Sequence, residues 1–274
     1  MAHLVAGAAA SHAPSIGTIK DPSVTPEWQR VFAGFDVIRE AFRRARPDVL
    51  LIIYNDHLDH FFLDAMPAFA IGAAPEFPAA DEGYGRPEEP PVPGHEGLGL
   101  FLVEQAYQSG FDPLIARELA VDHGVRIILP LIRPERDLPI VPVLQNCVAP
   151  PLPTARRCWE FGRFLADAIR RWPGSERVAV MGTGGLAHQL GGRNMGWIAE
   201  AFDRRVLGLL TEGSRAELAA LTNEEIAAAG NGTNEVRNWI TAAAAVGDAP
   251  GRVIAYEKIL VTGTGIVLWD VTSE

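Results

Sequence analysis

The chain has 274 residues, 48% of them hydrophobic, and a formal net charge of −10. The chain is long enough to bury a full hydrophobic core. Its longest apolar runs fall well short of the ~20 residues that a membrane-spanning helix needs. No Lys/Arg-rich segment offers a surface for nucleic acid. Because the two cysteines have no CxxC spacing and the N-terminus lacks the basic region of a signal peptide, we expect a cytoplasmic protein.

In the first part of the chain, apolar strands alternate with an amphipathic stretch. An apolar run over residues 4–10, ended shortly afterwards by a proline, predicts a strand that leads into a loop. Apolar residues recur every three or four positions over residues 27–46 and predict a helix, and residues 49–54 predict a buried strand. Residues 56–94 are rich in Pro, Gly and acidic residues, which predicts a long irregular stretch with one short strand near residues 68–71.

The alternation of strands and helices continues to the end of the chain. Further strands are expected at residues 113–116, 140–144, 177–181, 253–256 and 265–269, and further helices at 97–109, 155–171, 195–210, 224–229 and 234–246. Thr222 and Glu225 have the spacing of a capping box at the start of one of these helices. The pattern predicts one α/β domain over residues 1–274, with a mixed, largely parallel sheet covered by helices on both faces.

Four histidines lie where expected strands give way to loops. His12 follows the first strand, His57 ends a Tyr-Asn-Asp-His motif, His123 lies in Val-Asp-His-Gly, and His188 follows a Gly-rich turn. A single loop histidine is most often an ordinary hydrogen-bonded side chain. Because the carboxyl ends of parallel strands meet at one edge of a sheet, we expect these four imidazoles to converge on one site.

Neutral imidazoles together with one carboxylate, with coordination positions left open, are the ligands that a mononuclear non-haem Fe(II) oxygenase needs. Asp56 and Asp122 each adjoin a histidine and are better placed to orient a ring or a loop. Glu235 is the better ligand candidate, since it follows a Gly-Asn-Gly break at the start of an expected helix. A glutamate at that position also fits a purely structural role, as a complement to the helix dipole.

Five ordered motifs carry a family resemblance. They are Ser-His-Ala-Pro at 11–14, Tyr-Asn-Asp-His at 54–57, Val-Asp-His-Gly at 121–124, Gly-Thr-Gly-Gly-Leu-Ala-His-Gln at 182–189 and Gly-Thr-Asn-Glu-Val-Arg-Asn-Trp at 232–239. With these motifs the chain resembles the class III extradiol ring-cleavage dioxygenases. Within that family it is most similar to the catalytic β subunit of protocatechuate 4,5-dioxygenase and to the gallate and methylgallate dioxygenases.

The resemblance implies a role for each histidine of the motifs. His12, His57 and Glu235 would bind Fe(II). His188 would be the acid/base residue near the substrate hydroxyl, and His123 would line the pocket for dioxygen and substrate. The implied reaction opens a catechol ring with O2 and yields a hydroxymuconic semialdehyde-type product.

The resemblance also implies supporting residues and partners. Asn55 and Asp56 would support the site, and a small α-type lid subunit or self-association would close the pocket. The implied substrate is a catechol acid similar to protocatechuate or gallate, whose carboxylate needs a cationic or hydrogen-bonding partner. Arg126 and Arg193 are the basic residues nearest the motifs, although an arginine is most often a solvated surface residue.

Three other functions stay open at this point. Two histidines and a carboxylate also suit zinc in a hydrolytic metalloenzyme. A catalytically silent relative of the same fold would serve as a binding or scaffold protein. The pattern Gly182-x-Gly184-x-x-Ala187 fits a dinucleotide fingerprint for NAD, which requires a helix to open directly after the Gly-rich turn.

Overall fold

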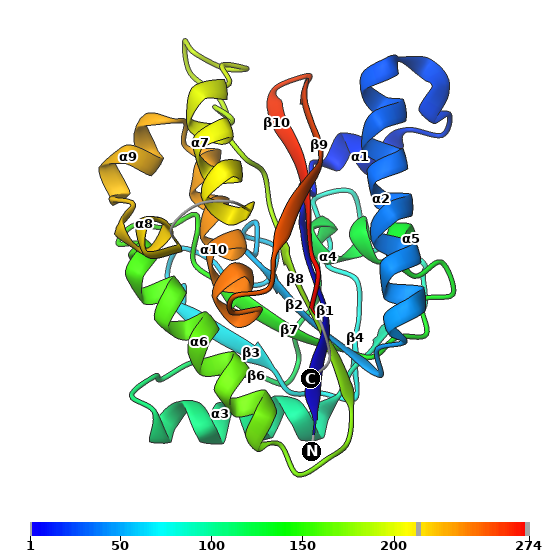
Figure 1. The fold of residues 1–274 in the computed structure, drawn as a ribbon, viewed down its shortest axis with the longest axis vertical. Helices are drawn as coiled ribbons and strands as arrows, with labels where there is room; N and C mark the ends of the chain where they lie inside the picture. The colour runs from blue at the N-terminus through cyan, green and yellow to red at the C-terminus, as the bar shows by residue number, and fades with distance from the viewer. Residues whose placement is uncertain (1, 212–214, 272–274) are drawn as a thin grey trace.

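The computed structural model describes residues 2–211 and 215–271. At its centre is an eight-stranded sheet in the order β6-β3-β7-β2-β8-β1-β10-β9 (Figure 1). Its strands are β1 His3–Ala10, β2 Val49–Tyr54, β3 Phe69–Gly72, β6 Leu114–Ala116, β7 Ile140–Gln145, β8 Arg177–Thr183, β9 Gly251–Ile259 and β10 Thr262–Trp269. Two short strands, β4 Glu76–Phe77 and β5 Val92–Pro93, form a separate antiparallel pair.

The middle of the sheet is parallel and its flanks are antiparallel. β7, β2, β8 and β1 run in one direction. β3 is antiparallel to β7 and parallel to β6, and the β9–β10 hairpin is antiparallel to β1. The central strand β2 is apolar and buried along its whole length, as expected for a strand with both faces covered by helices. The predicted mixed, largely parallel sheet is therefore confirmed.

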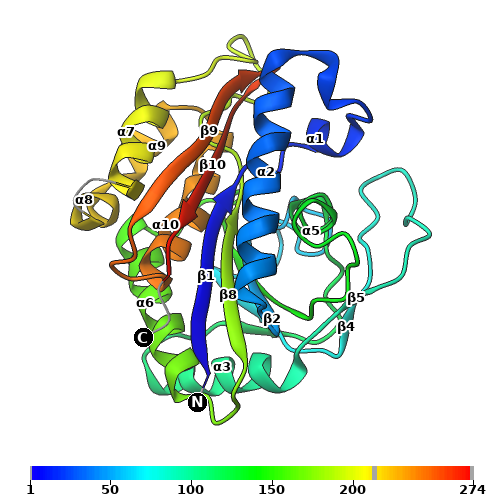
Figure 2. The ribbon, with the colours of Figure 1, turned by 45° about the vertical axis from the view of Figure 1, so that its right-hand side comes forward.

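The helices divide between the two faces of the sheet (Figures 1 and 2). On one face lie α1 Pro14–Thr18, α2 Pro26–Ala45, α4 His123–Arg126 and α5 Ile128–Ile132, with the short 3-10 turn η1 Pro22–Val24 leading into α2. On the other face lie α3 Glu96–Gln108, α6 Ala155–Arg171, α7 Glu200–Thr211, α8 Arg215–Ala220, α9 Asn223–Ala228 and α10 Val236–Ala245, preceded by the 3-10 turn η2 Gly232–Glu235. None of the helices in the described ranges combines the length and the apolar character needed to cross a membrane.

The segment between β8 and α7 differs from its sequence prediction. The helix expected from residue 195 begins at Glu200, because Gly191, Gly192 and Gly196 adopt positive φ angles of 68°, 70° and 85°, which form turns rather than a helix. No helix therefore opens directly after the Gly-rich turn that follows β8. The NAD interpretation is wrong on this geometry, since a bound pyrophosphate needs a helix N-terminus there.

Candidate metal centre

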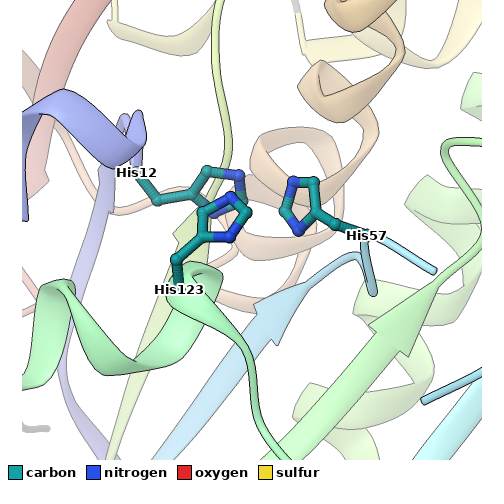
Figure 3. A group of neighbouring side chains, drawn as sticks. All are labelled: His12, His57 and His123. Atoms are coloured by element: carbon teal, nitrogen blue, oxygen red, sulfur yellow. The ribbon is translucent and has the colours of Figure 1, made fainter. Parts of the chain in front are cut away.

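Three imidazoles meet beyond the carboxyl ends of β1 and β2 (Figure 3). His12 and His57 follow these two strands, and His123 opens α4. The ring centroids lie 4.9 Å apart for His12 and His57, 4.0 Å for His57 and His123, and 5.4 Å for His12 and His123. One nitrogen of each ring lies within 4.8 Å of a nitrogen of the other two, so the three histidines form a group able to hold a metal ion.

Glu235 supplies a buried carboxylate to the same place. Its Oε2 lies 3.4 Å from His12 Nε2 and its Oε1 lies 3.1 Å from His57 Nε2. The positive φ of Gly230, 126°, turns the chain into η2, and this turn directs Glu235 inward with only 6% of its surface exposed. The contacts with two imidazoles give this carboxylate a role beyond complementing a helix dipole.

The hydrogen bonds of His12 leave one of its nitrogens free. The Thr183 hydroxyl donates to the carbonyl of Gly124 (2.9 Å), so its oxygen accepts from His12 Nδ1–H at 3.1 Å. The lone pair of His12 is therefore on Nε2, which is buried and has no hydrogen-bond partner among the described residues. A buried nitrogen without a partner is costly in an apolar interior, whereas a metal ion satisfies it.

Asp122 likewise holds the proton of His57 on Nδ1 and leaves Nε2 toward the site. Its Oδ2 accepts from His57 Nδ1–H at 2.8 Å and from the His57 backbone N–H at 2.9 Å. Its Oδ1 caps α4 by accepting from the Gly124 N–H at 2.8 Å. A carboxylate accepts only, so Nδ1 carries the proton and Nε2 is presented to Glu235, the arrangement in which metal-binding histidines are usually held. Two Nε2 atoms and one carboxylate fit a divalent iron or zinc ion.

The ionisation of these side chains follows from burial and contact. Burial lowers the pKa of His12, and Glu235 offsets this only in part. Burial also opposes charge on His57, but Asp122 and Glu235 hold its pKa well above the ordinary value. Burial acts to raise the pKa of Glu235, yet His12 and His57 hold it well below the ordinary value, and His57 likewise lowers the pKa of Asp122 to about 2 despite burial. Both carboxylates are therefore ionised at neutral pH and offer negative charge to a cation.

Asn55 and Asp56 lie behind these groups. Asn55 Nδ2 donates to Glu235 Oε1 at 3.2 Å, and its Oδ1 accepts from Asn238 Nδ2 at 2.9 Å. Asp56 accepts hydrogen bonds from the backbone N–H groups of residues 58–61 and so holds the loop that follows β2. Asn55 therefore orients the carboxylate of Glu235, whereas Asp56 stabilises the loop that carries His57.

His188 lies apart from the three-imidazole group, beside Glu235. Its Nδ1–H donates to the Leu186 carbonyl at 2.8 Å, which leaves Nε2 as the nitrogen that accepts a proton. The ring is held between two glycines: a Cβ atom on Gly232 would lie 1.9 Å from its Nε2, and one on Gly185 would lie 2.5 Å from its Cε1 and 3.2 Å from Glu235 Oε2. The expected convergence of four imidazoles thus takes the form of three together, with His188 close to the carboxylate.

Some contacts of the site were not expected from the sequence. Glu82, in the irregular stretch between β4 and β5, lies 2.7 Å from His123 Nδ1. Arg126 is four-fifths buried and pairs with Glu82 and Glu89, so it is not a solvated surface arginine, whereas Arg193 is exposed. None of the five motifs that carry the family resemblance includes Glu82.

Comparison with known proteins agrees with this geometry. Residues 6–267 match the family described as the catalytic LigB subunit of aromatic ring-opening dioxygenase. The chain is 30% identical to a 2,3-dihydroxyphenylpropionate/2,3-dihydroxicinnamic acid 1,2-dioxygenase of Burkholderia vietnamiensis over 85% of each chain. It is also 30% identical to the protein of that name in Azotobacter vinelandii, over 86% of this chain and 88% of the relative.

A solved structure shows the same fold. The crystal structure of an uncharacterised protein from Escherichia coli K12 superposes with a TM-score of 0.60 at 16% identity and covers 95% of this chain and 99% of that one. The family match spans the strand ends, His12, His57, His123, His188 and Glu235 alike. The chain belongs to the LigB family of aromatic ring-opening dioxygenases, which confirms the class III extradiol dioxygenase family predicted from its five motifs.

Proposed function

We propose that the chain is an Fe(II)-dependent extradiol dioxygenase that opens the ring of a catechol acid. The observation that carries this proposal is the pair of imidazole nitrogens, His12 Nε2 and His57 Nε2, which both lie against the ionised carboxylate of Glu235. Such a set holds Fe(II) with positions left open. Bound there, Fe(II) supplies the Lewis acidity that lowers the pKa of a catechol hydroxyl and the redox activity that dioxygen requires.

The other residues would hold the substrate's protons and shape the pocket. His188 Nε2 is the base that takes a proton from a catechol hydroxyl, because its Nδ1 is already committed to a backbone carbonyl. His123 lines the same space from α4. We assign the carboxylate of Glu235, rather than the third imidazole of His123, to the metal, because an anionic ligand lowers the charge of a buried dication.

Two observations bear on which catechol acid is the substrate. The resemblance favours protocatechuate or gallate, while the relatives named above act on 2,3-dihydroxyphenylpropionate, whose carboxylate lies on a side chain. Arg126, paired with two glutamates, is not free to bind a carboxylate on the ring. Measurement of kcat/KM for these three acids and for 4-methylcatechol at one iron loading ranks them. A tenfold preference for the uncharged catechol, equal to about 1.4 kcal/mol, would exclude an acid-specific pocket.

The central experiment separates metal ligand from base. Purified protein is loaded anaerobically with Fe(II), mixed with catechols and exposed to air, and the ultraviolet absorbance of ring-opened products is followed. Glu235→Ala should lose the iron, whereas His188→Ala should keep it and lose roughly 10²- to 10⁴-fold in turnover. His3→Ala, at the opposite end of β1, is the matched control and should change neither. Equal iron loss in the Glu235 and His188 variants would refute these assignments.

Metal analysis also addresses the remaining alternatives. Activity restored by Fe(II) and not by Zn²⁺ excludes a zinc hydrolase, and absence of turnover with every catechol in the panel would favour a silent relative. The lid subunit, self-association and cytoplasmic location stay predictions, which sedimentation of the purified protein and localisation in the source cells would test.

A further inference from the structure

We propose that Glu82 is a positioning residue that determines which nitrogen of His123 carries the proton. The inference rests on the proposed function, in which His123 lines the pocket for dioxygen and catechol. Glu82 Oε2 lies 2.7 Å from His123 Nδ1, and the two side chains are 25% and 13% exposed. Because a carboxylate only accepts, Nδ1 bears the proton and Nε2 is left to accept one in the pocket.

Glu82 is itself held in one orientation by the helix that carries His123. Its second oxygen, Oε1, accepts from Arg126 NH1 at 2.9 Å. His123 and Arg126 are the first and last residues of α4, three positions apart and hence on the same side of the turn. One carboxylate therefore bridges both ends of α4, and each oxygen has a fixed partner.

Further charged groups extend this arrangement. Arg126 also donates to Glu89, and Arg136 NH1 donates to the other oxygen of Glu89 at 2.9 Å. Two arginines and two glutamates thus alternate, all of them less than one third exposed. The alternation joins the irregular segment between β4 and β5 to α4, and it leaves Glu82 without freedom to turn away from His123.

The pairing with Arg126 dictates what a glutamine would do at this position. Glu82→Gln keeps the size of the side chain and leaves one acceptor oxygen. Arg126 has donors only, so the amide oxygen turns to Arg126 and the amide NH2 faces His123 Nδ1. Nδ1 must then accept, and the proton moves to Nε2. The nitrogen that accepted a proton in the pocket becomes a donor.

The consequence for catalysis is a loss of turnover without loss of binding. We expect Glu82→Gln to lower kcat about 10- to 100-fold, the usual effect of removing the partner that orients a site histidine. KM should change less than about threefold, since the substrate still reaches the same pocket. Iron content should equal that of the wild type, because His12, His57 and Glu235 are untouched.

The tautomer can be observed without metal or turnover. Long-range 15N–1H NMR spectra of the metal-free protein distinguish Nδ1–H from Nε2–H, and loss of one spin system in His123→Gln assigns His123. We expect Nδ1–H in the wild type, Nε2–H in Glu82→Gln and a mixture of the two in Glu82→Ala. Glu88→Gln is the matched control: Glu88 lies in the same segment, and its side chain pairs with none of the described residues.

The outcomes separate this inference from the proposed function. A wild-type tautomer together with wild-type kcat in Glu82→Gln would overturn the role of Glu82. Should Glu82→Gln not fold, the spectrum of Glu82→Ala decides, since Nδ1–H alone would then refute the assignment. If the wild type opens no catechol ring, the proposed function fails, while the tautomer spectra still test whether Glu82 positions His123.

Discussion

The buried carboxylate of Asp122 accepts hydrogen bonds from three donors, so the effect of Asp122→Asn on stability can be worked out from them. His57 Nδ1–H and N–H share Oδ2, and the Gly124 N–H uses Oδ1. The amide of Asp122→Asn has one oxygen, which stays with the two His57 donors. The amide NH2 group then faces the Gly124 N–H. One buried donor loses its acceptor, which costs about 1–3 kcal/mol of unfolding free energy.

Loss of the Asp122 charge should also weaken metal binding. Asp122→Asn keeps the Nδ1–H tautomer of His57 but removes its anionic partner, so Fe(II) affinity should fall about tenfold. Asp122→Ala leaves all three donors without an acceptor, and we expect about two- to threefold more destabilisation and about 100-fold weaker Fe(II) binding.

Urea unfolding of the metal-free protein and anaerobic calorimetric titration with Fe(II) measure the two quantities. Asp48→Asn, whose carboxylate accepts from the Arg177 N–H at the far end of β8, is the control and should leave Fe(II) affinity unchanged. Equal stability of Asp122→Asn and Asp122→Ala, or wild-type iron affinity in both, would refute the idea that Asp122 orients His57.

Three further changes have distinct readouts. Gly232→Ala places a Cβ 1.9 Å from His188 Nε2, so the ring must move, and kcat should fall about 100-fold with iron retained. Asn55→Ala frees Glu235 Oε1 and should weaken Fe(II) binding about tenfold in the same titration, and unchanged affinity would remove Asn55 from the site. Burial raises the pKa of Asp203, a buried residue of α7, to about 6. The stabilisation that this carboxyl group contributes is therefore complete below pH 3.8, its ordinary pKa, and is lost as the pH rises through 6. Urea unfolding should therefore show Asp203→Asn gaining up to about 3 kcal/mol relative to the wild type between pH 4 and pH 7, and a constant difference would contradict the raised pKa.

The sequence predicted those elements best in which several local signals coincide. The strand at residues 49–54 and the helix at residues 155–171 agree with β2 and α6 at both ends. For α6, apolar spacing and a capping Thr154, whose hydroxyl accepts from the Arg157 N–H, mark the same start. At α7, apolar residues continue the helical spacing back to Met195, but the positive φ of Gly196 interrupts the helix. The spacing of apolar residues does not reveal a positive φ angle.

In the candidate site, too, residues with a local sequence signal could be predicted, whereas a long-range contact could not. That His12, His57 and Glu235 lie near one another could be predicted because each follows a strand end or a glycine break, which is a local signal. Glu82 was missed because its contact with His123 joins residues 41 positions apart through a segment without periodic pattern. Such a pair exists only once the sheet has placed both segments on one side of the site, and no spacing within the sequence encodes it.

The position of β1 in the sheet bears on the order in which the protein matures. β1 is the first strand of the chain, yet it lies between β8 and β10, and its Ala10 pairs with Thr183 and Ile266. During synthesis at about 5–20 residues per second, β1 therefore waits roughly 10–35 s for its first neighbour. Over that interval the nascent chain presents an unpaired apolar strand, a natural target for chaperones. Because Glu235 leaves the ribosome later than β8, the proposed Fe(II) site can form only after β1 has gained that neighbour.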